Sequence, residues 1–179
     1  MSRCKLCLLA LHLMVNSGSM FRLTFFALAL AIAWPLHADS TLAPEKIYAQ
    51  ELVNETIAAH PDLLVVAMHV TPPGANDNVI IASNIGRIGK KADAEDRKVI
   101  DTGETLAKVN RNGDRFEVEL VLHDASRRPI GALAIVFPHR PGDDPQRFKK
   151  AAEAIRDDLA TRIPDVASLV QRYPVSSAR

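Results

Sequence analysis

The stretch RFEVELVLHDASRRPIGALAIVF, residues 115–137, decides the fold. In residues 115–123 every second side chain from Phe116 on is apolar, which predicts a strand with one dry face and one largely wet face, as in an antiparallel sheet. Residues 124–129 are mostly polar and end in proline, which indicates a turn. Residues 130–137 are apolar on both faces, which predicts a strand at the centre of the sheet.

Three further strands are predicted upstream of this pair. Residues 63–70 form a β-type apolar run that ends at a Pro-Pro-Gly sequence, and residues 79–83 form a second run. Residues 105–110 form the third, and Asn112-Gly113, a strong two-residue hairpin signal, joins it to residues 115–123. The chain therefore holds five predicted strands.

Three helices are predicted from apolar spacing and end signals. The first spans residues 44–59, with Pro44 at a first helical position and a stop at His60-Pro61. The second is short, with Asp93 as its cap and Gly103 at its end. The third begins at Asp143-Asp144-Pro145 and ends at Pro164.

This order of elements predicts an α+β fold, a five-stranded antiparallel sheet with the long N- and C-terminal helices packed on one face. The other face is then free to be roofed by the loop at 71–78 and the crossover at 84–103, where a small ligand would bind. Residues 39–164 are expected to form one domain. Residues 165–179 are a tail, in which Val166, Leu169, Val170 and Tyr173 have the spacing to dock one more turn.

Residues 1–38 have the pattern of a secretory signal peptide. They hold three basic residues and no acidic one, with an apolar run from Phe21 to Leu36 and a small residue, Ala38, before a polar stretch. Met20 stands just before Arg22, which predicts that translation starts there. The run is broken by a proline and is short for a bilayer span, so an uncleaved anchor is the second interpretation. The predicted location is periplasmic or secreted.

Composition excludes several classes of function. Both cysteines lie within residues 1–38, so the mature chain has no cysteine nucleophile and no disulfide. The chain has 22 basic and 21 acidic residues, and without the three basic residues of 1–38 the net charge becomes −2. The mature chain has no long basic run and no apolar run of bilayer length, which argues against a nucleic-acid partner and against a membrane span.

At this point the sequence resembles the Cache family, extracytoplasmic relatives of PAS domains, over roughly residues 44–163. Two segments carry the resemblance: the strand VIIASN at 79–84 with Ile88-Gly89-Lys90 after it, and the turn and strand DASRRPIGAL at 124–133. The resemblance implies small-molecule sensing outside the cytoplasm. We expect no output domain after the last long helix, so the signal would pass to a separate partner such as a membrane receptor.

The ligand-binding residues are expected around the crossover. Ser83, Asn84, Arg87 and Lys90 offer hydroxyl, amide and cationic donors, which would suit a small polar or anionic ligand. The alternative is that the glycines of this segment only permit tight turns and that its cations are solvated. The phosphate-loop pattern is excluded, because Asn84 stands where that pattern needs glycine.

His69, His123 and Arg115 complete the predicted site. His69 lies near the end of the first strand and His123 ends the fourth, and the two are expected to converge on the open sheet face. They would suit a metal, haem or pH switch, although surface positions at strand ends are the commoner case. Glu117 and Glu119 share one strand face, which would pair carboxylates for acid–base chemistry or, more ordinarily, place them on a solvated face.

The sequence therefore predicts an extracytoplasmic module that binds a small molecule, with no cofactor or metal and no catalytic residue. Motifs of serine hydrolases and zinc proteases are absent, which argues against an enzyme. Two alternatives stay open: a protein–protein module that acts on a membrane receptor, and a small periplasmic haem protein, metal-binding protein or enzyme.

Overall fold

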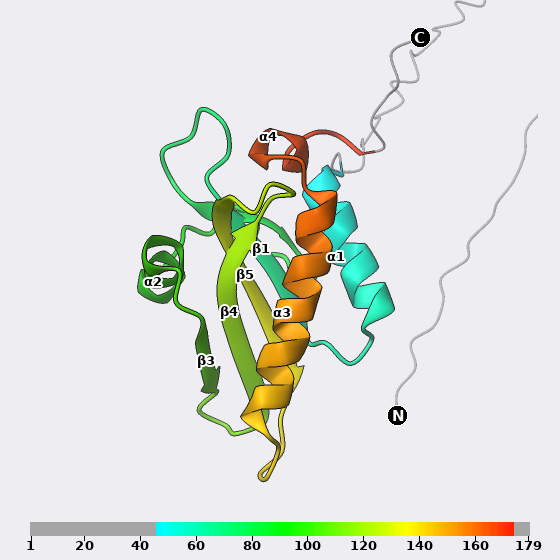
Figure 1. Cartoon of the computed structure of the whole chain (residues 1–179), viewed down its shortest axis with the longest axis vertical. Helices are drawn as coiled ribbons and strands as arrows, with labels where there is room; N and C mark the ends of the chain where they lie inside the picture. The colour runs from blue at the N-terminus through cyan, green and yellow to red at the C-terminus, as the bar shows by residue number, and fades with distance from the viewer. Residues whose placement is uncertain (1–45, 174–179) are drawn as a thin grey trace, which may run out of the picture. The chain divides into compact units, whose positions relative to one another are not determined.

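One antiparallel sheet of five strands organises the fold, with the strand order β2-β1-β5-β4-β3 (Figure 1). The computed structural model describes residues 46–173. Its elements are α1 (Tyr48–Ala59), β1 (Val65–Val70), β2 (Val79–Ser83), α2 (Ala94–Thr102), β3 (Leu106–Val109), β4 (Arg115–His123), β5 (Pro129–Pro138), α3 (Pro145–Arg162) and α4 (Val166–Leu169). The predicted fold class is confirmed, and β5 lies between β1 and β4 as its two apolar faces indicate.

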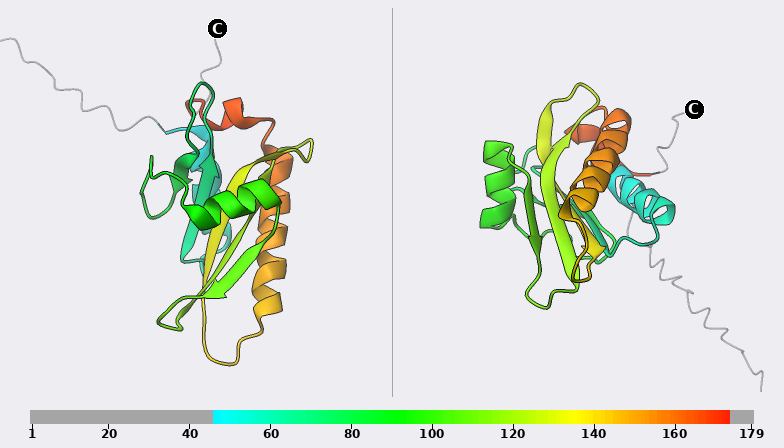
Figure 2. Two further views of the ribbon diagram at one scale, coloured as in Figure 1. Left: turned by 90° about the vertical axis from the view of Figure 1, so that its left-hand side faces the viewer. Right: turned by 60° about the horizontal axis from the view of Figure 1, so that its bottom comes forward.

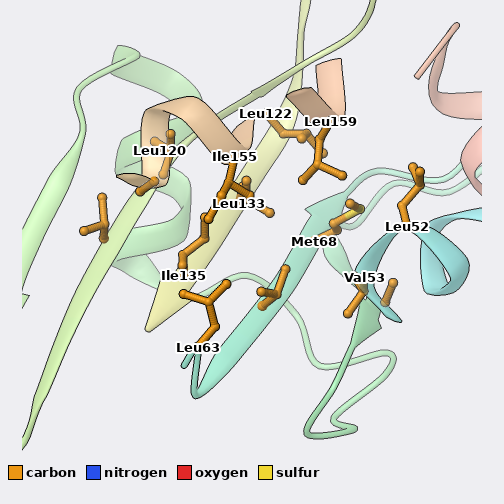
Figure 3. Packing of buried hydrophobic residues seen from close by; sticks show 14 of the residues in the cluster. Leu52, Val53, Leu63, Met68, Leu120, Leu122, Leu133, Ile135, Ile155 and Leu159 are labelled. Atoms are coloured by element: carbon orange, nitrogen blue, oxygen red, sulfur yellow. The ribbon is translucent and has the colours of Figure 1, made fainter. Parts of the chain in front are cut away.

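The long helices α1 and α3 pack on one face of the sheet, and α2 lies on the other (Figure 2). The face toward α1 and α3 carries the main core, to which the strands contribute large aliphatic side chains. Figure 3 shows how Leu120, Leu133 and Met68 from three strands meet Ile155 and Leu159 of α3. Each such side chain contributes roughly 1.5–3 kcal/mol by leaving water. Because most of the buried apolar residues belong to this cluster, this face supplies most of the hydrophobic stabilisation.

The end signals of the two later helices act as the sequence predicts. Asp93 caps α2 and accepts hydrogen bonds from the N–H groups of Glu95 and Asp96, and Gly103 closes the helix with a left-handed backbone. Asp144 caps α3, and Pro145 occupies its first turn. The Asp93 cap therefore sets where α2 begins.

The first helix begins later than predicted, at Tyr48. Ile47 stays extended and pairs with Arg172, and the N–H of Tyr48 bonds the carbonyl of Gln171 at 2.8 Å. This pairing competes with helix formation at Ile47, while Pro44 lies outside the described residues. The docked turn predicted in the tail is present as α4, whose Leu169 is fully buried.

Two smaller predictions differ from the structure. The β3–β4 hairpin has a four-residue loop, 111–114, because the N–H of Asn110 bonds the carbonyl of Arg115 and closes the ladder before Asn112-Gly113. The open face of β4 is not wet along its length, because α2 covers Glu119 and Val121, which are only 5% and 6% exposed.

The signal peptide predicted at 1–38 lies outside the described residues. Within residues 46–173, none of the helices combines the length and apolarity that a bilayer crossing requires.

Candidate functional site: a polar cavity beneath α2

A cavity of about 100 Å³ lies between the open face of the sheet and the segment that joins β2 to α2. Its apolar floor comes from β1, β2 and β5, and consists of Val65, Ala67, Ile80, Ala134 and Val136. Its polar side chains come from β1, β2 and β4, and are His69, Ser83, Glu117 and Glu119, together with Asp96 of α2. Its outer rim consists of Ile85, Arg87, Lys90, Asp93 and Glu95.

Small strand residues leave this space open. Across the middle of the sheet, Ala67 of β1 pairs with Ala134 of β5, and both side chains point toward α2. Farther along α2, Val99 packs against Val121 and Ala132 and closes the gap. The predicted crossover therefore roofs this face, with one half filled by apolar packing and the other half hollow and polar. The prediction that the loop at 71–78 shares the roof is wrong, because no residue of that loop lines the cavity.

Three buried titratable groups meet at the inner end of the cavity. His69 of β1, Asp96 of α2 and Glu119 of β4 are only 3%, 6% and 5% exposed. His69 Nδ1 lies 3.5 Å from Asp96 Oδ1, and the carboxyl groups of Glu119 and Asp96 are close enough for Asp96 to raise the pKa of Glu119. We call these three residues the floor cluster.

The environment of the floor cluster changes its protonation. Burial raises the pKa of Glu119, and hydrogen bonding with Asp96 and the negative charge of Asp96 raise it further, to about 9. The Glu119 carboxyl group is therefore protonated at neutral pH. Burial also lowers the pKa of His69, against the attraction of Asp96, and the charge of Lys90 lowers it further. The imidazole is therefore neutral at neutral pH.

Two atoms of the floor cluster are buried without a hydrogen-bond partner among the described residues. They are Nδ1 of His69 and Oε1 of Glu119. By contrast, Asp96 Oδ2 is occupied, because it accepts the N–H of Asp93 at 2.7 Å and so completes the capping box of α2. The cavity thus presents polar atoms that the fold itself does not satisfy.

The rim is held by ion pairs. Lys90 lies 3.4 Å from Asp93, and Lys108 of β3 pairs with Glu95 and lies 3.8 Å from Glu117. The hydrogen bond with Glu95 is the main reason that the pKa of Lys108 is raised. The rim carboxylates therefore each have a lysine neighbour.

Four of the seven predicted site residues line this cavity: Ser83, Arg87, Lys90 and His69. Asn84 does not, because its side chain continues the sheet edge: Nδ2 donates to the carbonyl of Leu64, and Oδ1 accepts the N–H of Val66 at 2.9 Å. Arg115 does not line it either, since it is exposed at the start of β4 beside Pro138.

The prediction that His69 and His123 converge is wrong. The β4–β5 pairing shifts register between Leu122 and His123, and the charged neighbours of His123 include Arg156 and Asp157 of α3. Burial lowers the pKa of His123, and the charges of Arg156 and Arg127 lower it further.

Sequence reasoning missed Asp96 and assigned Glu119 chiefly to a solvated face. A signal for Asp96 existed, because an acidic residue three positions after the cap Asp93 predicts a capping box. Nothing local reveals that the same carboxylate also faces His69. Within residues 46–173, no three histidine, cysteine, aspartate or glutamate side chains are grouped to hold a metal ion.

No protein-family model matches this chain, and no curated protein matches its sequence. Among solved structures, it is similar to the repressor BlcR of Agobacterium tumefaciens, with 12% identity and a TM-score of 0.44 over 65% of this chain and 67% of the other. It is also similar to a double mutant of the PobR transcription factor inducer-binding domain from Acinetobacter, in complex with 3-hydroxybenzoic acid, with 13% identity and a TM-score of 0.40 over 66% and 96%. With TM-scores this low, neither similarity defines a function for this chain.

Proposed function

We propose that this domain binds a small polar molecule in the cavity beneath α2 and serves as a sensing module outside the cytoplasm. One observation carries the binding part: His69 Nδ1 and Glu119 Oε1 line the cavity, are buried, and have no hydrogen-bond partner among the described residues. A buried polar atom left unsatisfied costs about 1–3 kcal/mol. A ligand that bonds both atoms recovers that cost on binding.

The size of the cavity supports a ligand of a few atoms. A single water needs about 10–15 Å³ of such space, and the cavity measures about 100 Å³. Burial of titratable groups with strongly shifted pKa values in a concave site is also typical of functional sites. The apolar floor from β1 and β5 would contact the nonpolar part of such a ligand.

The sensing and location parts rest on the sequence. Residues 1–38 have the basic start and apolar run of an export signal. The resemblance to Cache domains supports a role in which ligand occupancy is passed to a partner, for which a membrane receptor is the natural class.

A cavity-filling variant tests the binding proposal. The purified protein is screened by NMR chemical-shift changes against methylammonium, ethanolamine, acetate and glycerol. We expect at least one probe to shift the amides around the cavity, and Ala134→Leu to abolish this response because its side chain enters the cavity. Ala58→Leu, the same exchange on the exposed surface of α1, is the control and should bind normally.

Two results would overturn the binding proposal. One is the absence of a response to every probe. The other is an unchanged response in Ala134→Leu, with Ala67→Val as a second filling variant in case Ala134→Leu does not fold.

A reporter fusion tests the location. Residues 1–38 are fused to an enzyme that is active only outside the bacterial cytoplasm. We expect activity with the native segment and loss of activity with Leu28→Arg, which interrupts the apolar run. An inactive native fusion would contradict the proposed location and leave the binding proposal intact.

A further inference from the structure

The charges of the cavity are balanced at the rim and unbalanced at the floor. Lys90 pairs with Asp93, and Lys108 pairs with Glu95 and lies near Glu117. Neither Asp96 nor Glu119 has an ion pair with a lysine or arginine within residues 46–173. Asp96 lies 3.5 Å from the His69 imidazole, which is neutral at neutral pH, and Lys108 at the rim acts on Glu119 only through its charge. The inner end of the cavity therefore has two carboxyl groups and no cation.

Three acceptor positions converge there. Oε1 of Glu119 is unpartnered, and Oδ1 of Asp96 faces Nδ1 of His69 at 3.5 Å. Neutral imidazole supplies one acceptor nitrogen, and a carboxylate accepts on both oxygens. These three atoms come from three different elements, β4, α2 and β1, so the fold itself sets their spacing.

We propose that the floor cluster binds the head of a small primary ammonium ion, which donates its three N–H bonds to Glu119 Oε1, Asp96 Oδ1 and His69 Nδ1. This inference rests on the proposed function and names the class of its ligand. A primary ammonium group has three donors and no acceptor, which matches the three acceptors of the floor. A carboxylate ligand would instead face the negative charge of Asp96 in a buried site, where like charges repel most strongly.

The geometry also limits the size of the amine. The cavity of about 100 Å³ accommodates an ammonium head with a short chain, and the chain would lie against Ala67, Ala134 and Val136. Amino acids carry a carboxylate that this floor disfavours. Methylammonium and ethanolamine are therefore the matching probes, and a bulky quaternary ammonium ion has too few N–H donors and too much volume.

Binding is coupled to a proton. Glu119 is protonated at neutral pH, because its pKa is about 9, so binding of the cation displaces that proton to solvent. We expect affinity to rise from about pH 7 toward pH 9 and to fall when the amine itself loses its proton, near about pH 10. The other charged or titratable groups around Glu119 are Asp93, Glu95 and Asp96 from the start of α2, His69 from β1, Lys108 from β3, Glu117 from β4, and Arg87 and Lys90 from the joining segment.

Titration calorimetry with methylammonium and ethanolamine chloride tests the inference, with sodium acetate and glycerol as comparison ligands. We expect both amines to bind the purified protein at about pH 7.5 and Glu119→Gln to weaken them at least about tenfold, since a charge-assisted hydrogen bond is lost. Glu153→Gln, the same charge change on the exposed surface of α3, should bind like the native protein. Repeating the titration in two buffers of different ionisation enthalpy should reveal a proton released on binding.

The outcomes distinguish a failure of the amine inference alone from a failure of the proposed binding function. If acetate or glycerol binds in a way that Ala134→Leu abolishes and the amines do not bind, the cavity binds ligands and the amine inference is overturned. Amine binding that survives Glu119→Gln also overturns it. If no ligand binds, both proposals fail. The melting temperature of Glu119→Gln shows that a loss of binding does not arise from unfolding.

Discussion

The two faces of the sheet are built from the same strands but differ in composition: one carries the main apolar core, and the other carries the polar cavity. Toward α1 and α3, the strands present residues such as Leu120 and Leu133, which are fully buried in one continuous core. Toward α2, the same strands present alanines and valines together with the buried ionisable residues His69 and Glu119. Stability is concentrated on one face, and this leaves the other face able to hold polar groups that do not contribute to packing.

Neighbouring residues on one strand show this division. Because side chains alternate across a strand, Glu119 faces Asp96 of α2 while Val118 and Leu120 on either side of it enter the main core. A helix above the sheet is needed to bury Glu119 at all. The comparison between the faces therefore predicts that substitutions differ in effect according to the face they alter.

The largest effect is expected at the centre of the main core. Leu133→Ala should lower the free energy of unfolding by about 2–5 kcal/mol, since it removes a fully buried side chain from between α3 and the neighbouring strands. Urea denaturation followed by circular dichroism measures this loss. A loss below about 1 kcal/mol would mean that this face is not the main source of stability.

The next effect concerns pH and the opposite face. Glu119 has a pKa of about 9 in the fold against an ordinary value of 4.5. Its contribution to stability is thus complete below the ordinary value and is lost as the pH rises toward 9, because the unfolded chain releases this proton first. Glu119→Gln should remove that dependence and be more stable than the native protein by roughly 1–3 kcal/mol at about pH 8.

Urea denaturation across about pH 7–9 measures this difference. In most of that range His69 is neutral in both states, because its pKa is 6.5 in the unfolded chain and lower in the fold. Glu153→Gln serves as the control, and a native protein whose stability does not fall over this range would contradict the prediction.

A matched pair on β1 sharpens the comparison. Val66 is fully buried in the main core, and Val65, next to it, is 8% exposed and lines the cavity. We expect Val66→Ala to cost about 2 kcal/mol and Val65→Ala about 1 kcal/mol or less, because the first opens a void in close packing and the second only enlarges an existing space. Equal losses in thermal and urea unfolding would show that the two faces are packed alike.

The smallest effect is expected at Arg115. It is exposed at the edge of the open face and lies outside the cavity. Arg115→Ala should change stability by less than about 0.5 kcal/mol and leave ligand binding unchanged. A clear loss of binding in calorimetry would contradict this prediction and show that Arg115 belongs to the binding site.

Features that depend on local signals could be predicted from the sequence. The bounds of β2, the Asp93 cap and the Gly103 end of α2 follow from residues within a few positions of each. Alternation placed the dry face of β4 correctly, and two-sided apolarity placed β5 at the centre.

The composition of the site could not be predicted, because it depends on contacts between distant segments. Glu119 is buried only because α2, some twenty residues earlier, lies over it. His123 leaves the open face through a register shift, and Asn84 is used as a substitute for a strand partner. Periodicity gives no sign of these contacts, so it recovered the fold but only part of the cavity.

The segment that roofs the cavity is fastened at both of its ends. Asn84 bonds the backbone of Leu64 and Val66, the N–H of Gly89 bonds Ile80, and Lys91 pairs with Val79. A roof attached in this way cannot swing open as one piece without breaking strand-like hydrogen bonds. A molecule entering or leaving would therefore pass through motions of the long side chains of Arg87 and Lys90, so exchange should be fast and should leave the backbone trace nearly unchanged.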